Sequence, residues 1–380
     1  MRDRKIKVCY LRDTDKVCGP GKTMINTHRT IDQDAFSLTL CVTGGSEDGT
    51  NVFCESARKV GADVVHLKSG GFFDLGALFR LIKILKRRRI DILQTHDAQT
   101  RRLGVIASIV TGITHISSVH GWIETNQKRK MSVLLDKWLI RFSDKVIVMS
   151  EAMRAEIVSA GVPSDKVVTL YNAVLLDDYP IGDYSEEIRK EFGIAKDEKV
   201  IAFIGRLSGE KGPDVFIKAA YRIFKDYSNV RFLMVGDGPL RSSIEKSVDD
   251  LGLRSRVIFT GHRPEMAQIY AAIDILMISS FSEGLPNVLL EAFAYQRAVV
   301  STRVGGVPEI ISHGTSGFLV ESGSVDGLVS HALLLLRNPE IAEMMGKNGR
   351  KFLEEELGFR KRTETLEALY RSIIIGHRPK

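Results

Sequence analysis

The chain has 380 residues, 44% of them hydrophobic and 27% charged, a composition typical of folded proteins that excludes disordered and fibrous classes. This length exceeds one ordinary domain and suits two domains of roughly 150 to 200 residues. The formal net charge is +7, and its whole excess lies in residues 1–180, where 27 Lys and Arg face 20 Asp and Glu; residues 181–380 contain 27 of each sign. Such a one-sided bias indicates an anionic partner (nucleic acid, a phospholipid surface or a phosphorylated acceptor) or only a variable surface.

The hydrophobic segments and the cysteine spacing of the sequence limit the possible location and metal chemistry of the protein. The longest apolar stretch, 103–113, is far shorter than the roughly 18 to 20 residues that a membrane-spanning helix needs. The N-terminus shows no apolar signal-peptide core, so we expect a cytoplasmic protein. The four cysteines all lie in the first 54 residues without CxxC pairs or histidine partners at metal-ligand spacing. We therefore expect reduced thiols, no metal site and no cofactor.

Short β-branched runs alternate with longer amphipathic stretches along the first half, which predicts a parallel sheet flanked by helices. The predicted strands are residues 5–11, 36–42, 63–67, 92–95, 115–119, 145–149 and 167–170. A polar, turn-rich segment at 175–198 then interrupts the alternation, and we interpret it as an interdomain linker.

The alternation restarts in the second half. The predicted strands are 199–204, 230–235, 257–260, 275–277 and 298–302, and the predicted helices are 213–224, 240–251, 287–294, 325–337, 339–349 and 360–374. The sequence therefore predicts an α/β protein with two Rossmann-like, doubly wound domains. In such sheets ligands bind outside the carboxyl ends of the strands, so residues that follow strands are the candidate site residues.

The first strand of the second half ends in a loop with donors suited to a diphosphate. Gly205 and its neighbouring glycines allow a close approach of the backbone, Arg206 offers a planar fork of N–H groups, and Lys211 adds a point charge. A solvated turn before the helix that starts at Pro213 is the alternative interpretation of this loop.

The strongest signal follows strand 275–277, where seven residues separate two carboxylates, Glu283 and Glu291. Glu283 lies in a loop, whereas Glu291 lies in the helix that begins at Pro286. The N-terminus of that helix is a natural site for a phosphate. We expect Glu283 to accept hydrogen bonds from sugar hydroxyls and Glu291 to accept them from ribose hydroxyls.

Five motifs of the second half resemble family 4 glycosyltransferases of the GT-B fold. They are GRLSGEKG, GDGPL, FTGHR, FSEGLPNVLLEA and GGVPEII, and the span from Glu283 to Glu291 is the EX7E motif of that family. The resemblance implies an N-terminal acceptor-binding domain at 1–180, a nucleotide-sugar-binding domain at 181–360 and a C-terminal helix at 361–380 that packs toward the N-terminal domain. It also implies an interdomain cleft between the two domains.

The resemblance further implies roles for individual residues. Arg206 and Lys211 would bind the donor diphosphate, Glu291 the ribose and Glu283 the transferred sugar, while His262 would lie beside the base. The remaining donor-binding residues implied for the second half are Gly205, Gly284, Leu285 and Pro286.

The first half matches the family more loosely. His120, which follows strand 115–119, resembles the family's histidine in the loop that reaches the donor sugar; an ordinary loop or core histidine is the alternative. Gly19 and Gly21 correspond to the family's flexible glycine-containing loop near the diphosphate. The implied catalytic set is therefore Glu283, His120, Arg206 and Lys211.

We accordingly expect a retaining, metal-independent glycosyltransferase that moves a sugar from a UDP- or GDP-sugar to a glycan or lipid-linked acceptor, in polysaccharide or glycolipid assembly. Cationic side chains and helix dipoles that stabilise the negative charge of the departing diphosphate are the main contribution a protein makes to this step, so a metal ion is dispensable. The alternatives are a GT-B nucleotide-sugar epimerase and a non-enzymatic nucleotide-sugar-binding protein. We expect no nucleic-acid partner.

A basic, amphipathic stretch in the first half indicates a second interaction. Segment 78–90 places Lys83, Lys86 and Arg87–Arg89 on or near its polar side, and we group with them Arg101, Arg102 and 128–130. Together they fit peripheral contact with an anionic membrane, at the inner face of the plasma membrane, or a lipid-phosphate acceptor. A solvated helix face is the alternative.

Overall fold

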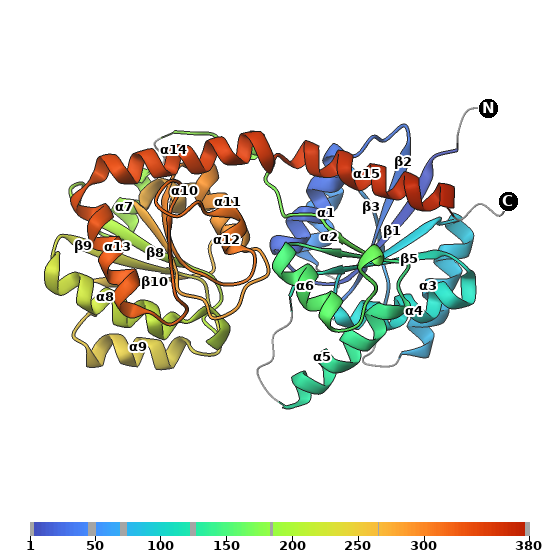
Figure 1. Ribbon diagram of the computed structural model, residues 1–380, viewed down its shortest axis with the longest axis horizontal. Helices are drawn as coiled ribbons and strands as arrows, with labels where there is room; N and C mark the ends of the chain where they lie inside the picture. The colour runs from blue at the N-terminus through green and yellow to red at the C-terminus, as the bar shows by residue number, and fades with distance from the viewer. Residues whose placement is uncertain are drawn as a thin grey trace. The chain divides into compact units, whose positions relative to one another are not determined.

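A computed structural model describes residues 4–44, 51–68, 74–121, 127–182, 185–264 and 266–376, without the side chains of 127–132. The chain forms two compact units (Figure 1). The first unit contains Met1–Asn172 and Phe359–Lys380, and the second contains Ala173–Gly358. The chain thus passes between the units a few residues before the boundaries expected at 180 and 360.

The first unit is built on a seven-stranded parallel sheet with the order β3-β2-β1-β4-β5-β6-β7. The strands are β1 (Ile6–Asp13), β2 (Phe36–Thr43), β3 (Asp63–His66), β4 (Ile92–Thr95), β5 (Thr114–Val119), β6 (Lys145–Val148) and β7 (Val167–Thr169). The order reverses between β1 and β4, so their carboxyl ends form the switch point where ligands bind in doubly wound sheets.

Helices cover both faces of this sheet, as right-handed crossovers in opposite directions require. Helices α1, α2 and α15 cover one face and α3, α4, α5 and α6 the other (Figure 1). Their bounds are α1 (Gly19–Thr30), α2 (Val52–Lys59), α3 (Leu75–Arg88), α4 (Ala98–Thr111), α5 (Gln127–Leu139), α6 (Glu151–Ser159) and α15 (Phe359–Gly376). Helix α15 joins this unit through a buried hydrogen bond between the hydroxyls of Tyr370 and Tyr10, 2.8 Å long.

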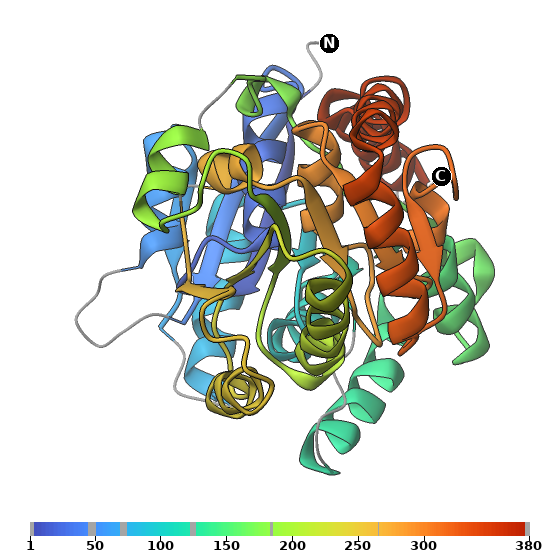
Figure 2. The same ribbon diagram turned by 90° about the vertical axis from the view of Figure 1, so that its left-hand side faces the viewer.

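The second unit repeats the design with six parallel strands in the order β10-β9-β8-β11-β12-β13. The strands are β8 (Lys199–Ile204), β9 (Val230–Val235), β10 (Val257–Gly261), β11 (Ile275–Ile278), β12 (Ala298–Thr302) and β13 (Phe318–Val320). The helices are α7 (Ser185–Glu191), α8 (Pro213–Asp226), α9 (Arg241–Asp250), α10 (Met266–Ala272), α11 (Asn287–Ala294), α12 (Val307–Ile310), α13 (Val325–Arg337) and α14 (Pro339–Glu356). Figure 2 shows helices on both faces of this sheet as well.

Helix α8 shows how the sequence sets this architecture. Gly212 precedes it in a left-handed conformation and Pro213 occupies its first turn, where a missing N–H costs nothing. Its apolar side chains recur at helical spacing, so one stripe is buried against the sheet. Phe216 packs edge-on against Phe203 of β8 and Phe232 of β9. Burying such a side chain contributes about 1.5–3 kcal/mol, so this face is a large part of the unit's stability.

Three local features differ from the sequence-based expectation. Segment 175–198 is not an extended linker: it contains α7, whose Ile188 is buried, and it belongs to the second unit. Strand β13 was not predicted, because three residues carry too little periodicity. Gly19 and Gly21 lie in the first turn of α1 and not in a loop, since Pro20 fixes a backbone angle that suits a helix start.

Candidate functional site

Most predicted site residues of the second unit lie in or directly after the loops that leave β8, β11 and β12, which are neighbours in the sheet. Backbone contacts join the first two loops. Phe281 and Ser282 donate their N–H groups to the carbonyl of Glu210 at 2.8 and 3.3 Å, and the Ser279 hydroxyl donates to the carbonyl of Gly212 at 2.8 Å. A Cβ on Gly212 would lie 2.2 Å from the Ser279 carbonyl oxygen, so only glycine permits this close approach.

Glu283 and Lys211 form the centre of this edge. The Lys211 Nζ lies 2.7 Å from both carboxylate oxygens of Glu283, although 72 residues separate them. The Ser280 hydroxyl donates to Glu283 Oε1 at 2.6 Å. The Glu283 side chain is 7% exposed and that of Lys211 is 27% exposed. The carboxylate is thus held in one orientation, while part of the ammonium faces solvent.

The loop after β12 closes the same edge. The Gly306 N–H donates to the carbonyl of Gly284 at 2.7 Å, and the Thr302 hydroxyl donates to the carbonyl of Ser280 at 2.7 Å. Gly305 has a φ of +51°, and a Cβ there would lie 1.9 Å from the carbonyl oxygen of Glu283. The conformation of the Glu283 loop therefore depends on a glycine in the neighbouring loop.

Helix α11 begins at this edge, as the sequence predicts. Pro286 is its N-cap and provides no side-chain hydrogen bond, and its first turn contains no acidic residue. The first N–H groups of α11 consequently lack a side-chain cap, and the helix dipole makes this end positive. Leu285 and Pro286 are buried beneath it. Lys211 and the start of α11 are two sources of positive charge at one edge of the sheet.

Glu291 has a different environment from Glu283. It is buried in the second turn of α11 and accepts the Tyr270 hydroxyl at 3.0 Å and the Tyr179 hydroxyl at 3.5 Å. Burial, with the Glu291 charge next in importance, raises the pKa of both tyrosines, so both stay protonated and donate. The ring of Tyr295 stacks on that of Tyr270 at 5.4 Å. Sequence reasoning missed these tyrosines, because nothing in the motif marks them.

The remaining residues predicted for the second unit are more exposed. Arg206 is exposed directly after Gly205. His262 is exposed in the turn after β10, at the edge of the sheet. The sequence also did not point to Ser280 or to Asn287, whose side-chain oxygen lies buried at the start of α11 without a partner among the described residues.

His120 lies in the first unit, directly after β5. Its Nε2 is 3.5 Å from Nδ1 of His96, which follows β4, and the two rings stack at 5.8 Å. Burial, followed by the charges of Arg12, Arg362 and Arg101, lowers the pKa of His120 to about 3. The imidazole is therefore neutral at physiological pH. Gly19 and Gly21 start α1 in the same unit.

We predict that the first unit loses stability as the pH falls below about 6.5. Burial lowers the pKa of His115 and His120 to about 3 and that of His96 well below 6.5. Unfolded imidazoles bind protons near pH 6.5, whereas folded His115 and His120 stay neutral down to about pH 3, and the pKa of folded His96 also lies well below 6.5. Each histidine therefore removes about 1.4 kcal/mol of unfolding free energy per pH unit within this window.

Urea unfolding at pH 8 and pH 5, monitored through hydrogen exchange in peptides of the first unit, measures this effect. The variant His120→Asn removes one of the three titrations and should give a shallower pH dependence. An unfolding free energy of the first unit that is equal at both pH values would contradict the assignment.

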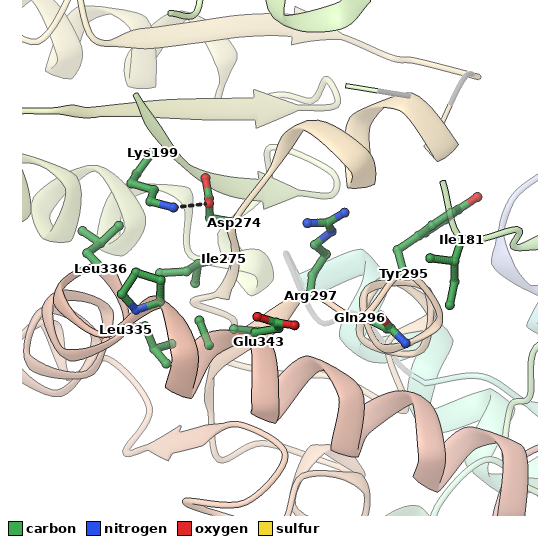
Figure 3. A pocket seen from close by; sticks show the side chains of 13 residues that line it. Ile181, Lys199, Asp274, Ile275, Tyr295, Gln296, Arg297, Leu335, Leu336 and Glu343 are labelled. Carbon is green, nitrogen blue, oxygen red and sulfur yellow. Dashed lines mark hydrogen bonds and ion pairs between the residues drawn. The ribbon is translucent and has the colours of Figure 1, made fainter. Parts of the chain in front are cut away.

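A pocket of about 210 Å³ lies elsewhere in the second unit (Figure 3). Lys199, Ile275 and Ala298, the first residues of β8, β11 and β12, contribute to its lining, and Lys199 pairs with Asp274 at 2.9 Å. The pocket therefore opens at the amino ends of the strands. It does not include any predicted site residue, all of which lie at or beyond the carboxyl ends.

Comparisons with known proteins identify both halves of the chain. The family described as "Glycosyl transferases group 1" matches residues 184–352, and the family described as "Glycosyltransferase Family 4" matches residues 19–178. The chain belongs to the family 4 glycosyltransferases and is a transferase, which confirms the family expected from the motifs.

Two curated relatives span most of the chain. N-acetyl-alpha-D-glucosaminyl L-malate synthase of Bacillus anthracis is 29% identical over 80% of each chain. UDP-Gal:alpha-D-GlcNAc-diphosphoundecaprenol alpha-1,3-galactosyltransferase of Escherichia coli is 25% identical over 98% of each chain. Among solved structures, HepE of Anabaena in complex with UDP and glucose superposes with a TM-score of 0.85 at 20% identity, covering 97% of this chain and all of the other. This likeness confirms the GT-B fold with its two Rossmann-like domains.

Proposed function

We propose that this glycosyltransferase is retaining and metal-independent, and that it moves a sugar from a UDP- or GDP-sugar to a glycan or lipid-linked acceptor. The observation that carries the proposal is the Lys211–Glu283 pair at the start of α11. A cation, an uncapped helix N-terminus and a fixed carboxylate are the groups that a diphosphate and an adjoining sugar require. HepE, which shares the fold, was solved with UDP-glucose, and the E. coli relative is named for a UDP-sugar donor.

The reaction separates charge, and the second unit contains groups suited to stabilise the charges that develop. When the sugar leaves, negative charge grows on the diphosphate and positive charge grows at the anomeric carbon. Lys211, Arg206 and the first N–H groups of α11 bind the diphosphate. Glu283 accepts hydrogen bonds from the sugar hydroxyls, and Glu291 accepts them from the ribose.

We infer front-face attack without a covalent intermediate. The acceptor hydroxyl attacks the anomeric carbon on the face from which the diphosphate leaves, and the departing phosphate oxygen takes the acceptor's proton. No protein nucleophile is needed, and His120, neutral at physiological pH, serves as a hydrogen-bonding group toward the sugar. Isolation of a glycosyl-enzyme on Glu283 would exclude this scheme.

Incubation with a panel of UDP-, GDP- and ADP-sugars, with and without a chelator of divalent metals, tests the proposal. Slow release of free sugar from one donor, unaffected by the chelator, is expected because water replaces the missing acceptor. Formation of a new nucleotide-sugar would indicate an epimerase, and the absence of any chemistry would indicate a binding protein. A thermal-shift screen with bare nucleotides selects the base first.

We further propose that the first unit contacts an anionic membrane through its layer of α3, α4 and α5, which lie side by side (Figure 1). Among the described side chains, seven large apolar ones of this layer are exposed, and so is Phe142 in the turn that follows α5: Leu75, Phe79, Ile106, Ile109, Val110, Leu134 and Trp138 are the seven. Segment 75–90 carries six Lys and Arg and no acidic residue. Apolar side chains beside unopposed cations fit an interfacial surface, and no helix in the described residues is long and apolar enough to span a bilayer.

The structure corrects two members of the predicted lipid-binding group. Arg101 is 1% exposed and pairs with buried Asp136, and Arg102 is also buried. Neither side chain is available to a lipid headgroup. The side chains of 128–130 lie outside the described residues.

We predict that the double variant Trp138→Ala/Phe142→Ala reduces binding to phosphatidylglycerol vesicles at least tenfold, because each buried aromatic ring contributes about 1–2 kcal/mol. Vesicle sedimentation measures the bound fraction. Met344→Ala, which removes an exposed apolar side chain from α14 of the second unit, is the control and should leave binding unchanged. Equal binding of the native protein to anionic and neutral vesicles would remove the membrane proposal.

A further inference from the structure

The first unit contains a buried arginine whose guanidinium is only partly satisfied. Arg12 is the penultimate residue of β1, at the switch point of the sheet, and it is 9% exposed. Its Nη2 donates to the Sγ of Cys18 at 3.1 Å. Its Nε and Nη1 have no hydrogen-bond partner in the described part of the chain. Buried donors without acceptors are rare in folded proteins, so the Nε and Nη1 groups of Arg12 are candidates for binding a ligand.

Arg12 also stands at the positive end of a helix. Cys18 is the N-cap of α1, a helix of 12 residues. The Cys18 side chain makes no capping hydrogen bond, and the first turn of α1 contains no acidic residue. The first N–H groups of α1 and the guanidinium therefore present donors and positive charge at the same point.

Two further buried side chains of the first unit have donors or ring nitrogens without a partner among the described residues, and one of them, His96, donates its backbone N–H to the carbonyl of Leu11, the neighbour of Arg12, at 3.0 Å. Arg362 of α15 is 9% exposed; its Nε donates to the Tyr171 carbonyl at 3.1 Å, but its Nη1 has no partner among the described residues. His96 is 6% exposed, and its Nε2 is likewise unpartnered there. The charges of Arg12 and Arg362 both lower the pKa of His96 and of His120, after burial as the main cause. Both guanidiniums therefore act on the same pair of rings.

Asp97, the acidic residue near Arg12, does not supply the acceptor that the Arg12 guanidinium lacks. Asp97 senses the charge of Arg12, but its Oδ1 accepts the N–H of Thr100 and its Oδ2 accepts the N–H of Asp13, each at 2.8 Å. Its main role is to cap α4 and to fix the end of β1. Two buried cations with free donors cost several kcal/mol in the absence of an anion.

We propose that the cluster of Arg12, Arg362, His96 and the α1 N-terminus binds an anionic group of the acceptor, a phosphate or phosphate ester, near the hydroxyl that receives the sugar. The inference rests on the proposed transferase function. The second unit has its own positive groups for the donor diphosphate, Lys211 and the start of α11. The excess positive charge of residues 1–180 fits an anionic acceptor as well.

Calorimetric titration of inorganic phosphate into the full-length protein, saturated with its preferred nucleoside diphosphate, tests the proposal. We expect phosphate to bind, and Arg12→Gln and Arg362→Gln each to weaken it at least ~10-fold, because a charge-assisted bond to a buried anion is lost. Arg58→Gln, which removes an exposed charge from α2 of the same unit, should bind phosphate like the native protein.

A stability measurement separates a ligand-binding role from a structural one. If the guanidinium serves a ligand, Arg12→Gln should unfold in phosphate-free buffer at the same temperature as the native protein or a higher one. Unchanged phosphate affinity in both variants would overturn the proposal. So would loss of phosphate binding on saturation with the nucleoside diphosphate, since the anion would then be the donor's. Release of sugar from a donor needs no acceptor, so that assay tests the transferase function separately.

Discussion

Replacing Gly305 with alanine is expected to lower the unfolding free energy of the second unit by about 3 kcal/mol or more and to abolish nucleotide binding. The new Cβ would lie 1.9 Å from the carbonyl oxygen of Glu283, and the residue would have to keep a φ of +51°. Relief of this clash must displace the loop that carries Glu283 or the loop that carries Gly305. Either movement also shifts the segment that leads from Glu283 into α11, whose first N–H groups we propose to bind the diphosphate.

Gly314→Ala is the matched control for this prediction. Gly314 also has a positive φ, +81°, but a Cβ there would meet nothing within 4 Å. Gly314→Ala should therefore lower the unfolding free energy only by the cost of a left-handed backbone, about 1–2 kcal/mol, and should retain nucleotide affinity. Thermal unfolding with and without the nucleotide measures both quantities. If the two variants lost equal stability and equal nucleotide affinity, the conclusion that the β11 loop depends on Gly305 of the β12 loop would be wrong.

Glu283→Gln is expected to reduce turnover of the donor by about 10²–10³ while changing nucleotide affinity by less than about threefold. The amide keeps the shape of the side chain but removes the charge that Lys211 and Ser280 hold in place. Lys211 remains available to the diphosphate, so nucleotide binding persists. The loss falls on the step in which positive charge develops on the sugar.

The control for Glu283→Gln is Glu321→Gln. Glu321 follows β13, its side chain is 82% exposed, and its Oε1 lies 3.6 Å from Nε of Arg303. The same chemical change at this exposed position should leave both turnover and affinity unchanged. Parallel titrations of the nucleotide and assays of donor turnover give the comparison. If affinity and turnover fell equally in Glu283→Gln, Glu283 would be a binding residue only.

The sequence predicts most strands and helices of the fold correctly because the alternation of apolar and polar residues that defines each of them is a local property. Strands 199–204, 230–235 and 298–302 have the bounds that were predicted, since each is an apolar run bounded by polar turns. The position of Glu283 in a loop and of Glu291 in a helix also follows from local signals, above all Pro286. Strand β13 and helix α7 are too short for such signals, and their neighbours in the fold determine them.

Side-chain partners are not local, and the sequence did not reveal them. Lys211 and Glu283 were predicted separately, and only the adjacency of β8 and β11 brings them together. The tyrosines around Glu291 come from α10 and from the segment before α7. Arg101 appeared to be a surface cation because helical spacing alone does not show that it faces Asp136.

Hydrogen–deuterium exchange with and without the nucleoside diphosphate that gives the largest thermal shift tests the central claim, that the carboxyl edge of the second unit binds the donor. We predict slower exchange in peptides covering 205–212 and 280–291, whose N–H groups would contact the diphosphate. Unchanged exchange in both peptides, with protection confined to the amino-edge pocket around 295–298 and 335–343, would contradict the account.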